Sequence, residues 1–276
     1  ANSLSDQSQQ MKHASIPHDP VAICLAECDP ATKCRCVAAL QPNDARIEGS
    51  PASLTPGRPS LPELVNPRDL PRRKLSTNKG HAAFVHAICH IEFTAINLAL
   101  DAAVRFGGMP PQYYADWLGV AKEEAKHFLL LDSHLRMLGF EYGEFSAHDG
   151  LWDLAERTSH DLLKRMALIP RVMEARGLDV TPNMVVRLES IGDDVGASIL
   201  NTILNDEIGH VAIGSRWFAY LCETRGLDTL TTFGQIIAAE LGEIRSSQLN
   251  LTARLSAGFS PAELDLLVNS SARKSS

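Results

Sequence analysis

Two short stretches of the sequence carry the same two metal-ligating residue types at the same spacing. Glu124 and His127 stand three residues apart, and so do Glu207 and His210. On an α-helix, residues three apart lie on one face about a turn from each other, so the carboxylate and the imidazole can reach one point. Oxygen and nitrogen donors of this kind suit iron or manganese. The two stretches therefore predict a metal site between helices.

Each Glu-x-x-His pair follows another acid at a similar distance along the chain. Glu92 precedes Glu124 by 32 residues, and Glu174 precedes Glu207 by 33. Glu92 stands in an apolar stripe of helical period, where a carboxylate is costly unless it is paired or binds a cation. Two such helical hairpins supply the ligands of a dinuclear carboxylate site in a four-helix bundle. The predicted ligands of two metal ions, iron or alternatively manganese, are Glu92, Glu124, His127, Glu174, Glu207 and His210.

Several acids compete for a place in or beside this site. Glu156, one turn before His160, is an alternative to Glu174 as the ligand from the third helix. Glu123 and Asp206 point about 100° away from the ligand face and are interpreted as neighbours of the site. A ligating histidine usually donates its second ring nitrogen to a carboxylate or carbonyl. Candidates for that partner are Asp101, Asp193 and Asp194.

Other residues that could do chemistry have simpler interpretations. Tyr113, Tyr114 and Trp117 are expected to pack in the core. The histidines at 81, 86 and 90 are interpreted as core or surface residues, with an access path to the metals as the alternative. The four N-terminal cysteines match no usual zinc spacing, and a chain with a real core needs no disulfide framework, so reduced thiols are expected. These are Cys24, Cys28, Cys34 and Cys36.

The elements that must position the ligands are predicted to be helices throughout. Helical periodicity covers 79–106, 111–138, 151–176 with a kink or break at Pro170, and 192–225. Gly177 is expected to end the third helix, and Thr181-Pro182 to cap a short segment as far as 191. We expect an all-α protein in three parts. They are an N-terminal extension (1–77) with short helices and a Pro-rich surface segment, a bundle (78–226), and C-terminal helices (227–276) at about 228–256 and 260–269.

Charge and hydropathy exclude some classes of function. The net charge of −7 argues against a general nucleic-acid-binding surface. The sequence has no run of eighteen apolar residues and its first twenty residues have no apolar signal-peptide core, so a cytoplasmic protein without a membrane span is expected. Residues 1–17 and 270–276 are expected to be loosely attached.

The motifs also resemble a ferritin-like family that is known only as a domain of unknown function. The resemblance rests on residues 86–92, 123–128, 170–179 and 206–211, with Pro-Gly-Arg-Pro at 56–59 and Leu-Pro-Arg-Arg at 70–73. It covers roughly residues 20 to 225 and implies a ferritin-like four-helix bundle. It favours Glu174 over Glu156, because Glu174 lies in one of these stretches.

The resemblance implies a range of activities. The wider ferritin-like superfamily includes oxygenases, hydroxylases (a tRNA hydroxylase among them), oxidases, catalases and iron stores. The first hypothesis is an oxidoreductase that uses O₂ or peroxide on an unknown small-molecule or nucleotide-containing substrate. The alternatives are a metal-handling or peroxide-scavenging bundle, or a metal-free interaction scaffold. The sequence leaves the oligomeric state open, including a homodimer.

Overall fold

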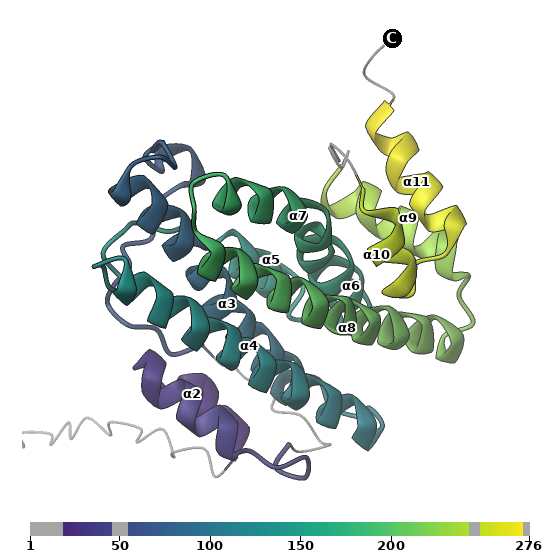
Figure 1. Ribbon diagram of the computed structural model, residues 1–276. Coiled ribbons are helices and arrows are strands. Elements are labelled where there is room, and N and C mark those ends of the chain that lie inside the picture. The colour runs from purple at the N-terminus through teal and green to yellow at the C-terminus, as the bar shows by residue number, and fades with distance from the viewer. Residues whose placement is uncertain (1–18, 46–54, 243–248, 273–276) are drawn as a thin grey trace, which may run out of the picture.

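The computed structural model describes residues 19–45, 55–242 and 249–272, and its regular elements there are all helices (Figure 1). A single isolated bridge, between Leu64 and Ala147, is the only strand-like pairing in these ranges. The predicted all-α class is therefore confirmed. The predictions for residues 1–17 and 273–276 lie outside the described residues.

The first hairpin consists of α3 (Asn78–Arg105) and α4 (Pro111–Met137). The Thr77 side chain caps α3 by accepting from the Gly80 amide, and Pro111 suits the first turn of α4 because its missing N–H would be unpaired there. Twenty of the 28 residues of α3 are buried. It is the one described helix long and apolar enough to cross a membrane, but 78% of that apolar window is buried inside the molecule.

The third arm of the bundle, which is the part of the chain between α4 and α8, is divided into more helical segments than the sequence predicted. It comprises α5 (Gly150–Arg157), α6 (Leu162–Leu168), a π-helical segment (Ile169–Glu174) and α7 (Ala175–Glu189). Pro170 cannot donate an N–H, and the wider π-helical turn accommodates this break in the α-helical hydrogen-bond pattern. The expected stop at Gly177 and cap at Thr181-Pro182 are wrong, because α7 runs through all three residues.

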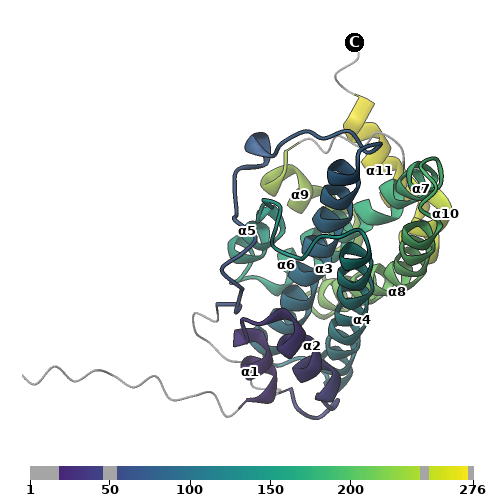
Figure 2. The ribbon, with the colours of Figure 1, turned by 60° about the vertical axis from the view of Figure 1, so that its left-hand side comes forward.

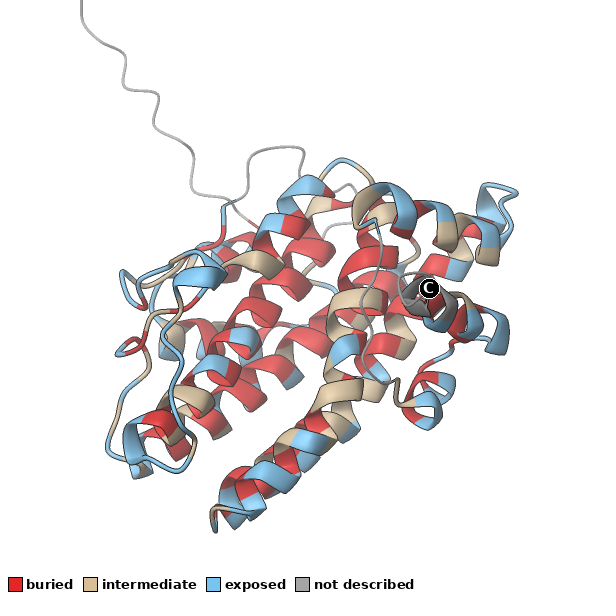
Figure 3. Ribbon diagram, turned by 90° about the horizontal axis from the view of Figure 1, so that it is seen from above, coloured by how far each residue is buried: buried red, intermediate tan, exposed pale blue. Residues whose placement is uncertain are grey.

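The fourth arm, α8 (Asp194–Thr224), packs against α4, α6 and α7. The helices described after it are α9 (Thr229–Glu240), α10 (Leu251–Ser256) and α11 (Pro261–Ala272). Figure 3 shows that the buried residues of the bundle helices face one another along its middle. Apolar packing between the arms therefore holds the predicted ligands in place.

A buried cation joins the C-terminal helices to the π-helical segment. The Arg171 guanidinium lies 4.2 to 4.8 Å from the ring centroids of Phe218, Phe233 and Phe259. Its Nη2 also donates to Glu263 Oε1 at 2.7 Å. The arrangement fixes the backbone three residues before Glu174.

The N-terminal helices α1 (Pro20–Ala26) and α2 (Pro30–Ala39) pack on α3 and α4, away from α10 and α11 (Figure 2). Asp19 caps α1 and Asp29 caps α2. The two helices are joined by a disulfide between Cys24 and Cys36, so the expectation that these thiols are free is wrong. The pair falls twelve residues apart, and only the turn between α1 and α2 brings the two sulfurs together.

Candidate metal centre

Four of the predicted ligands converge at the centre of the bundle. Oxygen atoms of Glu92, Glu124 and Glu207 and a ring nitrogen of His127 all lie within 4.8 Å of one another. They come from α3, α4 and α8. Nδ1 of His127 is 3.3 Å from Glu92 Oε2 and 3.2 Å from Glu124 Oε2. Three carboxylates and an imidazole from three helices thus meet at one largely buried point.

His210 approaches the same carboxylates from α8. Its Nδ1 lies 3.0 Å from Glu124 Oε1 and 3.3 Å from Glu207 Oε1. His127 and His210 are both fully buried, and their rings are 5.9 Å apart between centroids. Both imidazoles therefore present Nδ1 to the carboxylates, and Glu124 lies between them.

The outer nitrogens of the two histidines meet carboxylates of the opposite helix. Nε2 of His127 is 3.0 Å from Oδ2 of Asp206, and Nε2 of His210 is 2.6 Å from Oε2 of Glu123. On each helix the carboxylate precedes the histidine by four residues, and each histidine meets the carboxylate of the other helix. This crossed pairing is possible because α4 and α8 are antiparallel. A carboxylate at Nε2 keeps a proton on that nitrogen, so Nδ1 is the ring atom that can give up its proton and bind a metal.

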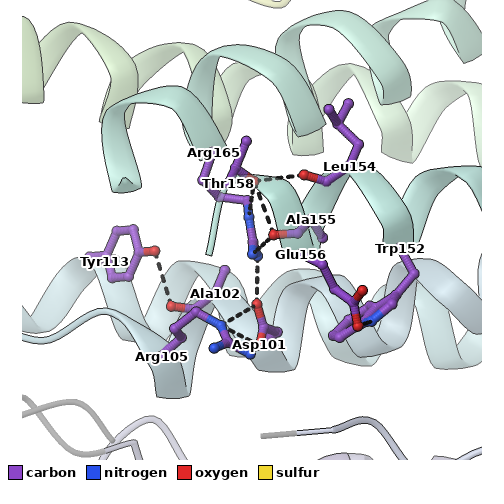
Figure 4. A network of polar contacts seen from close by, with 10 residues as sticks. All are labelled: Asp101, Ala102, Arg105, Tyr113, Trp152, Leu154, Ala155, Glu156, Thr158 and Arg165. Atoms are coloured by element: carbon purple, nitrogen blue, oxygen red, sulfur yellow. Dashed lines mark hydrogen bonds and ion pairs between the residues drawn. The ribbon is translucent and has the colours of Figure 1, made fainter. Parts of the chain in front are cut away.

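These contacts show that Glu123 and Asp206 are hydrogen-bond partners of the two histidines. The 100° rotation that turns Glu123 and Asp206 away from the ligand face turns them toward the neighbouring helix. The alternatives Asp101 and Asp193 are wrong, because both have other partners. Asp101 is buried between Arg105 and Arg165, at 2.6 Å from each guanidinium, in the network of Figure 4. Asp194 opens α8 and makes no contact with either histidine.

The sixth predicted ligand, Glu174, enters from the π-helical segment. Glu174 lines the same cavity as Glu92, Glu124 and Glu207. Glu156 does not line this cavity, and its Oε1 accepts a hydrogen bond from Trp152 Nε1 at 2.9 Å (Figure 4). The structure thus brings Glu174, and not Glu156, to the carboxylate cluster.

The cluster is electrostatically costly in the metal-free chain. Burial raises the pKa of Glu92 well above its usual range, and the negative charge of Glu124 raises it further. Burial and the charges of Glu207 and Glu124 raise the pKa of Glu174 to about 8. Burial likewise raises the pKa of Glu207. Like charges held this close favour protonation or a bound cation.

Glu124 and the two histidines respond in the opposite sense. Burial alone would raise the pKa of Glu124, but the charge of His210 and hydrogen bonds to both imidazoles hold it well below its usual range. Burial opposes protonation of His127, yet hydrogen bonds to Glu124 and Glu92 raise its pKa to about 11. Protons therefore stand between the imidazoles and carboxylates where a cation could replace them.

Four buried polar atoms of the cluster make no hydrogen bond of acceptable geometry, although three of them lie 3.0 to 3.3 Å from a group of opposite charge. They are Glu92 Oε2, Glu124 Oε1, Glu174 Oε2 and His210 Nδ1. Buried donors and acceptors are normally satisfied, because leaving one unpaired costs about 1–3 kcal/mol. Four such atoms on predicted ligands fit a site built to coordinate metal.

The remaining chemistry-bearing residues are mostly structural. Tyr113 and Tyr114 are buried and donate their hydroxyls to backbone carbonyls of Ala102 and Phe106, as expected for packing residues. His86 Nε2 accepts from the Gly143 amide at 2.9 Å. Burial lowers the pKa of His86 to about 4, so its ring is neutral. His90 pairs with Tyr142 and borders a second cavity, described below.

Comparisons with known proteins place the chain in a family. Residues 26–265 match the model of a family described as a protein of unknown function (DUF455). An uncharacterized protein from Haemophilus influenzae is 48% identical over 214 residues, which cover 75% of this chain and 74% of that protein. No solved structure matches the chain. The chain therefore belongs to the DUF455 family of proteins of unknown function.

Proposed function

We propose that this protein is a dinuclear metal carboxylate oxidoreductase of the ferritin-like type, an oxygenase or hydroxylase. The residues that would hold the two ions are Glu92, Glu124, His127, Glu174, Glu207 and His210. When bound, two iron or manganese ions would bind O₂ or peroxide and supply the oxidant. The charges support this stoichiometry, because two divalent ions balance four carboxylates once both imidazoles are neutral.

The observation that carries the proposal is a mainly apolar cavity beside the carboxylates. It has a volume of about 100 Å³, and Glu92, Glu124, Glu174 and Glu207 form its polar side. Apart from Thr181, its other walls are apolar, with Ala95, Leu98, Met184, Leu200 and Ile203 among them. A storage or scavenging site has no need of an apolar chamber next to its ligands. Such a chamber excludes water and receives the apolar part of a substrate.

A second cavity adjoins the first. It has a volume of about 240 Å³ and shares Ile91 and Leu151 with the smaller cavity. Arg73 and His90 also line it, and the Arg73 guanidinium lies 5.2 Å from the Phe145 ring centroid. We place the body of the substrate here, with an anionic or polar group near Arg73 and the reacting carbon past Ile91.

The direct test is iron loading followed by O₂ consumption. Metal-free protein is titrated anaerobically with Fe²⁺ and then mixed with oxygenated buffer. We expect two Fe²⁺ per chain and rapid O₂ uptake by the wild-type protein and by Glu156→Ala. Glu174→Ala should lose most of the iron or of the O₂ uptake. Iron uptake without O₂ consumption would favour metal handling, and no iron uptake by any variant would favour the scaffold hypothesis.

The position of the ions is tested separately. A crystal grown with iron and without chelator should give two peaks in a map calculated at the iron absorption edge. Two-metal sites place their ions roughly 3.5–4 Å apart. Peaks that lie away from Glu124 and the two histidines would contradict the proposed ligand set.

A further inference from the structure

A second group of metal-ligating side chains lies at one end of the bundle, outside the carboxylate cluster. Nε2 of His81 is 2.6 Å from Oδ2 of Asp193, and Nε2 of His134 is 2.8 Å from the same oxygen. His81 comes from the first turn of α3, His134 from the last turn of α4, and Asp193 is the N-cap of α8. The three donor atoms lie within 4.8 Å of one another.

The group is separate from the dinuclear centre. His134 follows His127 by seven residues on α4, which is two turns or roughly 10 Å along the helix axis. The nearest imidazole of the dinuclear centre is directed to Asp206, whereas His134 is directed to Asp193. The two groups share no residue.

The residues around the group leave room for a single ion but not for a further side chain. A side chain at Gly196 would place its Cβ 2.2 Å from Asp193 Oδ2 and 3.0 Å from His134 Nε2, so bare backbone closes this side. Asp193 Oδ1 accepts from the Gly196 amide, which fixes the carboxylate and points Oδ2 at the histidines. The His81 side chain is 13% exposed, against 4% for His134. One side of the group therefore remains open to solvent.

We propose that His81, His134 and Asp193 form a mononuclear site for a divalent transition ion with the preferences of Zn²⁺. Two imidazole nitrogens and one carboxylate oxygen are one of the three-ligand sets with which zinc keeps water in its fourth position. Metal bonds of about 2.0–2.1 Å require the donor atoms to separate by roughly half an ångström from their hydrogen-bonded distances. The water would occupy the exposed side next to His81.

A bound ion would cross-link the ends of three helices. The ends are the start of α3, the end of α4 and the start of α8. An ion that binds the folded chain and not the unfolded one stabilises the fold by mass action. This site acts on stability and needs no activity at the dinuclear centre.

The test uses the full chain with the dinuclear site disabled. In a Glu124→Ala, Glu207→Ala background, metal-free protein is titrated with ZnCl₂ by calorimetry, and its thermal midpoint is followed. We expect one Zn²⁺ per chain and a midpoint about 5 °C higher at a hundredfold excess over Kd. Loss of a residue that hydrogen-bonds a metal ligand weakens metal binding by up to roughly 100-fold. Because His81 is itself a proposed ligand, adding His81→Gln should weaken Zn²⁺ binding by at least that factor. His160→Gln, an exposed histidine elsewhere, is the matched control and should change neither quantity.

Three results would overturn the site, two from the titrations and one from X-ray absorption. The first is that the Glu124→Ala, Glu207→Ala protein takes up no Zn²⁺ and keeps its thermal midpoint. The three side chains would then serve only to hydrogen-bond the helix ends to one another. The second is undiminished binding in His81→Gln. Zinc-edge X-ray absorption of the background protein requires no further variant, and it should show two imidazoles in the coordination shell. A shell without imidazole would refute the assignment.

Discussion

Gly214 on α8 offers the sharpest test of how the ligand from the third arm is positioned. A Cβ at Gly214 would lie 2.3 Å from Pro170 Cβ and 2.4 Å from Pro170 Cγ. Ordinary contacts begin near 3.4 Å, and a proline ring has no flexible end to swing aside, so α8 and the π-helical segment must separate by about an ångström. Overpacking of this kind costs about 1–3 kcal/mol. We therefore expect Gly214→Ala to lower the free energy of unfolding.

Gly209, five residues earlier on the same helix, is the matched control. A Cβ there meets no atom within 4 Å, and alanine favours a helix interior over glycine by about 0.5–1 kcal/mol. Gly209→Ala should therefore stabilise the chain. The helix-propensity gain is common to both variants, so they should differ by the overpacking cost of about 1–3 kcal/mol in urea unfolding of metal-free protein. Gly214→Ala should also retain less iron, because the displaced segment carries Glu174. Equal stability of the two variants would refute the close packing described for Pro170.

Three further substitutions test other parts of the structure. Asp206→Asn removes the carboxylate at His127 Nε2 and should lower iron affinity by roughly 10–100-fold in a chelator competition, with unfolding little changed. His86 has a folded pKa of about 4 against 6.5 when unfolded, so it favours the fold above pH 6.5 and loses up to roughly 3 kcal/mol as pH falls to 4. His86→Gln should flatten that acid limb of the urea-unfolding profile, and an unchanged slope would contradict the assignment. Asp101→Asn leaves the Arg165 charge buried without its partner and should cost about 3–5 kcal/mol by urea unfolding; a loss below about 1 kcal/mol would argue against the network.

The sequence contained enough to locate the helices that carry the first hairpin of the site. Helical periodicity is strong in α3 and α4, and Glu92, Glu124 and His127 fall on their apolar faces. The third arm was harder, because a proline can end a helix, kink it or enter a π-helical turn. The choice at Pro170 depends on how closely Gly214 lets α8 approach, and this is a property of two segments 44 residues apart.

The outer contacts of the site depend on which helices are neighbours. Glu123 and Asp206 look like solvent-facing residues on their own helices. They become partners of the histidines only when α4 and α8 lie antiparallel in one particular register. The same reason hid the disulfide and the group around Asp193. Spacing along the chain says little about residues that meet only after the arms have packed.

The contacts of Arg171 with three phenylalanine rings and Glu263 imply that removing the C-terminal helices would disturb the bundle. A protein shortened at residue 226 would keep Phe218 but lose Phe233, Phe259 and Glu263, leaving a guanidinium in a half-open apolar hollow. Water would enter there, and the π-helical segment that carries Glu174 would lose the packing around Arg171. The C-terminal helices are therefore linked through Arg171 to the turn that carries Glu174, and changes in these helices would reach the carboxylate cluster.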